Sequence, residues 1–360
     1  MHTRRGFLGA LGAGALAPAG LRLPSRAYSK HDLWARTTGP HLRGAVFAQR
    51  RVYRALDGDY FLGPGPVGAP ISVGALANLA ELGANFANWS GPGPFAEAGG
   101  YELDQAIVDH IGRWLDQCRS NGLFTVLSFR SGPGRSAFAF HPGETWYPAE
   151  LYDASLWQNE EKQDAWARMV AWVLEEFGDH PALAGVLALA EPNGLDFGSA
   201  QTWLNFAGRI QVQCEGLDAV CPLLLSPDRW ARVSEAAALR AHVGLRPVLV
   251  THDYSPWAYT HPQNGSKPGF DADETVPAPS FDLGNAAVLE FGMLNGARNQ
   301  ESYLRQRISV YEQAGCNWAA FRWTSGWEPY ESVENRRSLA INPEALSVLR
   351  QAFSGSSLRP

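Results

Sequence analysis

The chain has 360 residues, of which 45% are hydrophobic and 18% are charged, as expected for a globular protein with a large core. This composition excludes an intrinsically disordered chain. The formal net charge of −6 leaves no basic surplus to neutralise a phosphate backbone, so nucleic acid is not an expected partner.

Residues 1–27 are the first predicted element, an export signal in front of the folded domain. Thr3-Arg4-Arg5-Gly6-Phe7-Leu8 leads into a Gly/Ala-rich run from Leu11 to Ala17, a pattern that resembles a bacterial twin-arginine signal. Cleavage after Ala17, Ala19 or Ala27 is open, and a disordered basic N-terminus is the alternative. The apolar run is shorter than the about 20 residues that span a membrane, so we expect export to the periplasm or the extracellular space without stable membrane insertion.

Residues 28–360 alternate short apolar runs with longer amphipathic segments, which is typical of β/α units around a parallel sheet. The expected strands are Gly44–Ala48, Ala84–Trp89, Phe124–Phe129, Gly185–Ala190, Pro222–Leu225, Pro247–Thr251, Ala287–Phe291 and Trp318–Trp323. The expected helices are Ser72–Leu82, Asp104–Ser120, Asn159–Phe177, Ala200–Glu215, Ser234–Ala241, Glu301–Ala314 and Pro343–Ala352. Eight such strands predict a single-domain α/β fold, a (β/α)8 barrel of the TIM type.

The four cysteines, Cys118, Cys214, Cys221 and Cys316, lack the C-x-x-C spacing of zinc and redox motifs. Buried thiols are the expected state, and a local disulfide between Cys214 and Cys221 is the alternative.

Three long loops, Ser90–Gly100, Ser131–Leu156 and Ser255–Asp282, all follow predicted strands. Barrel enzymes place their functional sites on this face. Glu191 directly follows the fourth strand, and Glu290 lies at the end of the seventh. Either carboxylate alone fits a strand-end salt bridge as well as a functional role, but strands four and seven lie across the barrel mouth, so the pair can flank a substrate bond from two sides.

These residues carry a resemblance to a known family. Glu191-Pro192 and Glu290-Phe291-Gly292, with His252-Asp253-Tyr254 after strand six and Trp323 and Trp327 after strand eight, resemble the strand-end motifs of clan A glycoside hydrolases, most nearly family 5. The resemblance implies that Glu191 is the acid/base and Glu290 the nucleophile. It also implies that Tyr254 lies against the nucleophile and that Trp323 and Trp327 form a platform under the substrate sugar.

The chain departs from the family pattern at two positions. Ala190 stands where the family has Asn before the acid/base, and Asn88 stands where it has Arg after strand two. The missing Asn normally holds the sugar 2-hydroxyl, a contact that strengthens in the transition state. The candidates that can compensate are Asn193, Asn88 and the loop Arg130-Ser131-Gly132-Pro133-Gly134-Arg135 after strand three. The complete set of expected substrate-binding residues is Asn88, Trp89, Arg130, Asn193, His252, Tyr254, Trp257, Trp323 and Trp327.

The resemblance implies cleavage of a β-linked oligo- or polysaccharide with retention, through a covalent glycosyl-enzyme and without a cofactor or metal. Two nearby carboxyls cannot both ionise cheaply, so we expect Glu191 to hold a proton, and Glu290 to be ionised and contacted by Tyr254 and a guanidinium such as that of Arg130. A metal-dependent barrel hydrolase is disfavoured because the first strand, Gly44–Ala48, carries no ligand. The alternative function is a degenerate barrel that binds carbohydrate without turnover, motivated by Ala190 and Asn88.

Overall fold

The computed structural model describes residues 29–35, 39–72, 74–261, 269–270, 285–293, 297–323 and 345–360. The export signal expected at residues 1–27, Trp327, and residues 262–268 and 271–282 of the expected loop Ser255–Asp282 lie outside the described residues.

Eight parallel strands close a barrel in the order β1-β10-β9-β8-β7-β6-β5-β4. These strands are β1 Arg43–Ala48, β4 Phe86–Pro92, β5 Phe124–Ser131, β6 Leu183–Leu187, β7 Leu223–Leu225, β8 Val248–His252, β9 Ala286–Phe291 and β10 Asn317–Ala320. Outside the barrel, β2 Arg50–Arg51 pairs antiparallel with β3 Val67–Gly68. Each expected strand overlaps one barrel strand, so the prediction of a single-domain (β/α)8 barrel is confirmed.

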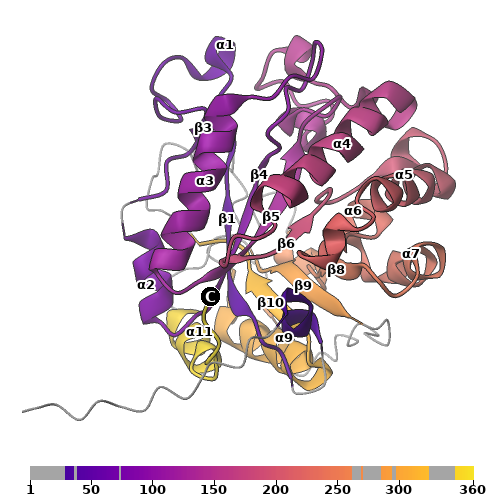
Figure 1. Cartoon of the computed structure of the whole chain (residues 1–360). Helices are drawn as coiled ribbons and strands as arrows, with labels where there is room; N and C mark the ends of the chain where they lie inside the picture. Colours follow the sequence, from indigo (N-terminus) through magenta and orange to yellow (C-terminus); the bar gives the residue numbers. More distant parts are fainter. Residues whose placement is uncertain are drawn as a thin grey trace, which may run out of the picture.

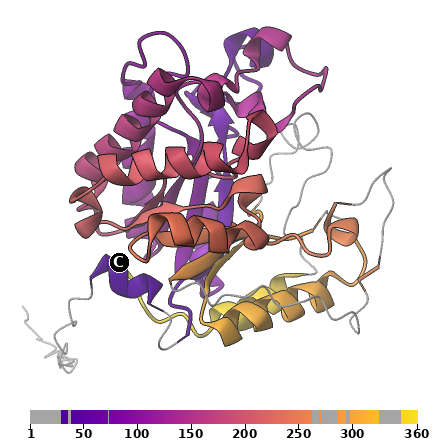
Figure 2. The same ribbon diagram turned by 90° about the vertical axis from the view of Figure 1, so that its right-hand side faces the viewer.

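Helices form a layer around the strands (Figures 1 and 2). The longer ones are α2 Ala75–Glu81, α3 Gln105–Ser120, α4 Glu160–Phe177, α5 Ala200–Gln213, α7 Ala236–Val243, α9 Gln300–Ala314 and α11 Leu346–Phe353. Single turns are α1 Arg54–Asp57, α6 Asp228–Ala231 and α8 Trp257–Thr260. Short 3-10 helices cover Lys30–Trp34, Ala137–Phe140, Ala149–Leu151, Ser155–Gln158, Gly194–Phe197, Leu217–Ala219 and Val233–Glu235.

Helix α3 illustrates how the sequence produces this outer layer. Asp104 caps its first turn by accepting hydrogen bonds from the backbone N–H groups of Ala106 and Ile107. Ile107, Ile111 and Trp114, spaced by three or four residues, are buried on one face of the helix. The indole of Trp114 donates a 2.9 Å hydrogen bond to Oγ1 of Thr125 on β5. This face therefore fixes the helix against the barrel.

The interior of the barrel is apolar and closed at the amino ends of the strands. Side chains such as Val46, Val126 and Leu289 form one buried cluster inside the barrel, and Trp34 of the N-terminal 3-10 helix joins it from below. The Trp34 indole donates a 3.0 Å hydrogen bond to the carbonyl of Ala184 on β6. Because this end is sealed, a ligand has access to the barrel from the carboxyl ends of the strands.

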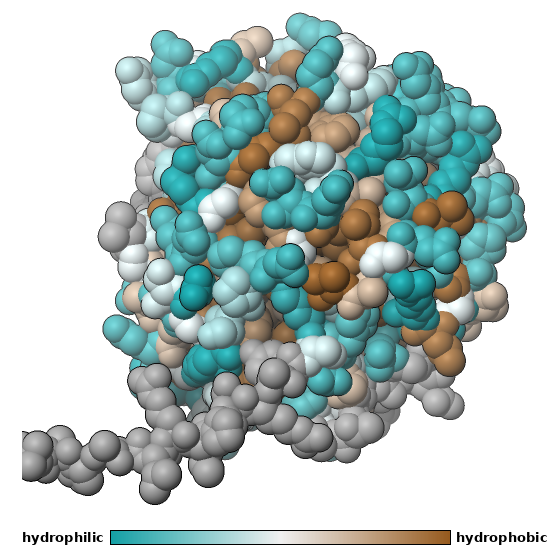
Figure 3. Space-filling view, viewed as in Figure 1, coloured by the Kyte–Doolittle hydropathy of each residue, from teal (hydrophilic) through white to brown (hydrophobic). Residues whose placement is uncertain are grey.

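The four cysteines are free thiols and all are buried, as expected from their spacing. In the part of the chain that the structure describes, no helix combines the length and apolarity needed to cross a membrane. The face shown in Figure 3 is mostly hydrophilic, with apolar residues in scattered patches.

Candidate active site

The carboxylate of Glu290 points into the barrel mouth because β9 is irregular. Leu289 belongs to the interior cluster, so strict alternation would turn the next residue outward. The pairing of β9 shifts by one residue against both β8 and β10 at this point. Such an irregularity re-aims a side chain, and Glu290 consequently lies opposite His252.

Glu191 lies four residues after the end of β6, the fourth barrel strand, in an unusual backbone conformation. Its φ of 52° is in the left-handed region, which is uncommon for a residue with a side chain. The buried guanidinium of Arg135 donates 3.0 Å hydrogen bonds to the carbonyls of Ala190 and Glu191 and a 3.1 Å bond to that of Arg130. Arg135 therefore ties the two strand ends that carry Arg130 and Glu191 together.

His252, at the end of β8, lies between the two carboxylates. Its Nδ1 is 3.0 Å from Oε1 of Glu191 and 3.4 Å from Oε2 of Glu290. The hydroxyl of Tyr254 donates a 3.2 Å hydrogen bond to Oε2 of Glu290. One carboxylate oxygen of each glutamate and a ring nitrogen of His252 lie within 4.8 Å of one another. The ends of β8 and β9 and the segment after β6 thus form one compact polar cluster.

Arg130, on β5, adds a cation to this cluster. Its Nη1 lies 3.6 Å from Oε1 of Glu290 and its Nη2 lies 3.8 Å from Oε2 of Glu191. The guanidinium packs over the ring of Phe140 at 4.0 Å from the ring centre. The family pattern has an arginine after the second strand, where this chain has Asn88. Here the third barrel strand places a guanidinium next to both carboxylates.

The charges of the cluster shift its pKa values. Burial alone would raise the pKa of Glu191, but the hydrogen bond and charge of His252, together with Arg130, hold it below its usual value. Burial raises the pKa of Glu290, with only partial opposition from His252. For His252, burial favours the neutral ring, but the charges of Glu290 and Glu191 outweigh burial and raise the pKa. The directions of these pKa shifts are opposite to those that the expected assignment, with a protonated Glu191 and an ionised Glu290, would need in the unliganded protein.

Glu191, His252 and Glu290 are also the group of side chains, among the described residues, whose ligand atoms are spaced for a metal ion. Carboxylate and imidazole donors suit several divalent cations. The guanidinium of Arg130, 3.6 Å and 3.8 Å from the two carboxylates, opposes a second cation at the same place. The donor set therefore permits a metal, whereas the neighbouring charge disfavours it.

A large cleft opens beside the cluster. It has a volume of about 830 Å³ and is lined by Phe140, Glu191, Trp230, Arg232, Val233, Ser234, His252, Asp253, Tyr254, Ser255, Trp257 and His261. Trp257 is 60% exposed, and its ring stacks on His261 with the ring centres 3.7 Å apart. Aromatic side chains beside the carboxylate of Glu191 give the cleft a lining of the kind that sugar rings prefer.

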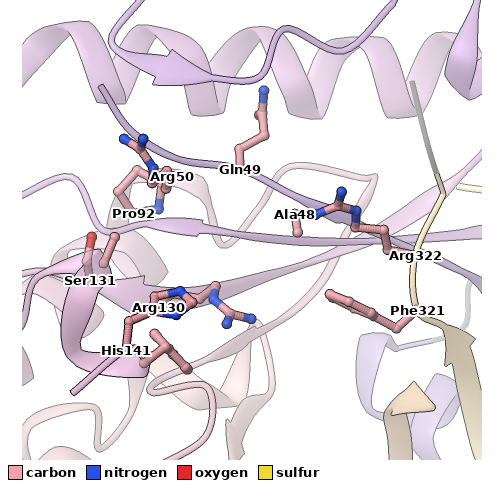
Figure 4. Close-up of a pocket in the computed structure, with 11 residues that line it drawn as sticks. Ala48, Gln49, Arg50, Pro92, Arg130, Ser131, His141, Phe321 and Arg322 are labelled. Atoms are coloured by element: carbon pink, nitrogen blue, oxygen red, sulfur yellow. The ribbon is translucent and has the colours of Figure 1, made fainter. Parts of the chain in front are cut away.

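Five of the expected substrate-binding residues do not line this cleft: Arg130 lines the smaller cavity beside it (Figure 4), Trp323 is described below, and the other three are Asn88, Trp89 and Asn193. Asn88 is fully buried below the cleft, where Ser128 donates to its Oδ1 at 2.7 Å. Trp89 faces the outer core because side chains alternate along β4, and its indole donates to Gln49 at 2.9 Å. Asn193 is buried and donates to Asp196 at 3.3 Å.

At the end of the eighth barrel strand, Phe321 and not Trp323 faces the interior of the barrel. Trp323 packs against the outer core cluster, whereas Phe321 packs against the interior cluster and faces Tyr254 with the ring centres 6.4 Å apart. β10 ends at Ala320, earlier than expected. The alternation of a strand therefore did not predict which side the residues after Ala320 face. Trp327 lies outside the described residues.

Sequence reasoning missed Phe140, Trp230, Phe321 and Arg322, all of which line cavities at the barrel mouth. Trp230 follows the fifth barrel strand by only a few residues, so a search for aromatics after every strand would have found it. Phe140 lies in a long loop without periodicity and gives no such signal.

Comparison with solved structures shows that the fold is shared with glycoside hydrolases. Endoglucanase Cel5A from the hyperthermophilic Thermotoga maritima superposes with a TM-score of 0.63 at 16% identity, over 89% of this chain and 100% of that one. A hyperthermophilic endo-beta-1,4-glucanase in complex with substrate gives 0.60 at 15% identity, over 91% and 100% of the two chains. A further structure, described as a glycoside hydrolase, gives 0.61 at 18% identity, over 87% and 99%. No family model matches the sequence, and no curated protein has significant sequence similarity to it.

Proposed function

We propose that this protein is a retaining glycoside hydrolase that cleaves a β-linked oligo- or polysaccharide, with Glu191 as acid/base and Glu290 as nucleophile. The observation that carries the proposal is the approach of the two carboxylates to within 4.8 Å. Retaining enzymes hold their carboxyl groups about 5 to 5.5 Å apart, whereas inverting enzymes need about 6.5 to 9.5 Å to admit a water molecule. The fold shared with endoglucanases supports the same class of reaction.

The first step needs a protonated Glu191 and an ionised Glu290. His252 Nδ1 lies 3.0 Å from Glu191, so a protonated imidazole can pass its proton to Glu191 in one short transfer, which gives the reactive state. Glu290 then attacks the anomeric carbon while Glu191 protonates the leaving oxygen. Arg130 and Tyr254 stabilise Glu290 while it is charged. In the second step Glu191 takes a proton from water as the water oxygen attacks the anomeric carbon, which breaks the bond to Glu290, releases the sugar and restores the enzyme.

The test compares the purified protein with Glu290→Ala and Glu191→Ala on β-linked aryl glycosides and polysaccharides. We expect activity in the wild type and a loss of about 10³-fold or more in each variant, because each removes a group that acts only in the transition state. The matched control is Glu301→Ala, which removes an exposed glutamate from α9.

Azide rescue tests Glu290 as the nucleophile, and NMR of the first sugar released tests retention. Azide rescue of Glu290→Ala should give an α-glycosyl azide, because azide attacks from the vacant nucleophile side, and the first sugar released by the wild type should be the β anomer. Release of the α anomer would refute retention. Carbohydrate binding without turnover, unchanged in Glu290→Ala, would instead favour the degenerate binding barrel.

A further inference from the structure

A buried polar cluster lies behind the candidate active site, between the end of β8 and helix α9. Figure 1 shows α9 in the outer layer, beside β9 and β10. From this helix, Arg307 and the hydroxyl of Tyr311 both donate to Oδ2 of Asp253, the hydroxyl at 2.7 Å. Asp253 is only 3% exposed, and Arg307 and Tyr311 are fully buried. We call these three residues the α9 clamp.

Asp253 stands in the sequence between two residues of the site, His252 and Tyr254. Side chains alternate along an extended chain, so Asp253 faces the helix layer when its two neighbours face the barrel mouth. The backbone N–H of Asp253 donates a 2.9 Å hydrogen bond to the carbonyl of Glu290. Its Oδ1 accepts a 3.2 Å hydrogen bond from the N–H of Ser255. Asp253 therefore joins helix α9 to the backbone of both strand ends that carry the site.

Tyr311 contacts the neighbouring strand as well. Its ring packs edge-on against Phe291, the residue after Glu290, with the ring centres 5.0 Å apart. Burial, reinforced by the charge of Asp253, raises the pKa of Tyr311 well above its ordinary value, so the hydroxyl stays a donor at neutral pH. One side chain of α9 thus contacts both the segment after β8 and the end of β9, where the pairing of these two strands shifts register.

Packing alone does not require a polar cluster at this place. Leu304 and Ile308 fix the same helix to the outer core through apolar contacts. A buried ion pair loses much of its attraction to the cost of desolvation, and apolar side chains of similar volume are often as stabilising. A buried pair differs in having directional donors and acceptors, which fix one geometry. The cluster lies beside the irregular strand pairing that turns Glu290 into the site, where such a fixed geometry has a use.

We propose that Asp253, Arg307 and Tyr311 are positioning residues for the nucleophile. By fixing the ends of β8 and β9 relative to each other, the α9 clamp holds His252 and Tyr254 against Glu290. The role of Glu290 as nucleophile rests on the proposed function, whereas the coupling between the clamp and the contact of Tyr254 with Glu290 does not.

The first test is Tyr311→Phe, which removes the hydrogen bond to Asp253 but keeps the ion pair and the ring on Phe291. We expect kcat on the best aryl glycoside to fall about tenfold and KM to change by less than about twofold, because a misplaced reacting group weakens binding of the transition state more than binding of the substrate. Asp253→Asn, which also removes the charge, should lower kcat further. Tyr303→Phe is the matched control and should keep the wild-type kcat. It removes a buried hydroxyl from the same helix, and that hydroxyl has no hydrogen-bond partner among the described residues.

The second test does not need turnover. Urea denaturation of Tyr311→Phe, Tyr254→Phe and the double variant measures whether the two hydroxyls, which bond to different carboxylates, are coupled. Independent sites give additive losses in the free energy of unfolding, whereas sites in one network do not. We expect the double variant to lose less than the sum of the two single variants. The effect of Tyr311→Phe on kcat should likewise shrink when it is combined with Tyr254→Phe.

Additive losses of stability would overturn the inference, and so would a kcat in Tyr311→Phe equal to that of Tyr303→Phe. Either result, obtained with an active wild type, would leave the hydrolase proposal standing. A wild type without turnover on any substrate, together with non-additive unfolding, would refute the hydrolase proposal and leave the coupling between the α9 clamp and Tyr254 in place. Absence of turnover together with additive unfolding would refute both.

Discussion

The hydroxyl of Tyr254 donates a 3.2 Å hydrogen bond to Oε2 of Glu290 at the centre of the barrel mouth. Burial, reinforced by the negative charge of Glu290, raises the pKa of Tyr254 well above its ordinary value. The phenol therefore keeps its proton and remains a donor to Glu290 at neutral pH. This contact is one that the family resemblance implied from the spacing of His252 and Tyr254.

Replacing Tyr254 with Phe removes this donor and little else. A hydrogen bond to a charged group contributes about 1.5–3 kcal/mol, so we expect kcat/KM to fall by about 10- to 100-fold in Tyr254→Phe. Steady-state kinetics on the best aryl glycoside provide the measurement. Tyr259→Phe, which loses a 2.9 Å hydrogen bond to the carbonyl of Arg298 instead, should retain its activity. Unchanged kinetics in Tyr254→Phe would show that Glu290 does not depend on this contact.

The pKa of His252 should fall when Glu290 is replaced by Gln. In the wild type the charges of Glu290 and Glu191 raise this pKa despite burial. Loss of the Glu290 charge removes a stabilising interaction from the protonated ring only, so the ring loses its proton at lower pH. NMR titration of the imidazole signals measures the shift. Glu144→Gln, beside His141, should leave the His252 titration unchanged, and an upward shift in Glu290→Gln would contradict the charge arrangement described above.

Chelators should leave the activity intact. Glu191, His252 and Glu290 present metal-ligand spacing, but the Arg130 cation lies 3.6 Å and 3.8 Å from the two carboxylates. Treatment with EDTA followed by desalting is the test, with Zn²⁺, Mn²⁺ and Ca²⁺ added back separately. Activity that disappears on chelation and returns with one cation would replace the two-carboxylate mechanism with a metal-dependent one.

The repeating features of this fold were predictable from the sequence because each β/α unit carries its own signals. Apolar runs gave the eight barrel strands, and amphipathic spacing gave helices such as α3. Glu191 and Glu290 were found because each lies at or within a few residues of a strand end, where the barrel brings distant segments together. These are local patterns with a global consequence, since strand ends converge in any closed parallel barrel.

Side-chain direction at irregular positions was not predictable. Glu290 faces the site because of a register shift in β9, and no residue type in the sequence indicates such a shift. Trp89 and Trp323 were candidates because they lie near strand ends, but one residue of parity decides whether such a ring faces the cleft or the outer core. Phe321 and Arg322 were not predicted as site residues, because β10 ends at Ala320 and strand alternation does not fix the direction of the residues that follow.

Replacement of Trp89 is expected to lower the stability of the fold without affecting substrate binding. Its fully buried indole packs in the outer core and donates a 2.9 Å hydrogen bond to Gln49. Trp89→Phe should lower the free energy of unfolding by about 1–3 kcal/mol, through a lost hydrogen bond and a small void. Urea denaturation measures this loss, and KM should stay the same. Trp257→Ala provides the contrast, because this exposed ring lines the cleft and its loss should raise KM with little change in stability.

Arg135 should couple the stability of the barrel mouth to the activity of Glu191. Its buried guanidinium satisfies the carbonyls of Arg130, Ala190 and Glu191, and burial lowers its own pKa to about 9. Arg135→Met leaves these acceptors without their donor, so we expect a loss of about 3–5 kcal/mol in the free energy of unfolding.

Because the left-handed conformation of Glu191 then loses its support, kcat should also fall in the fraction of Arg135→Met that remains folded, even though no reacting group has changed. Urea denaturation and kcat measured below the unfolding transition separate the two effects. Arg305→Met, which removes an exposed arginine from α9, is the control for loss of charge. A variant with reduced stability but normal kcat would show that the backbone of Glu191 keeps its geometry without Arg135, and that the strained turn is maintained by the strand ends themselves.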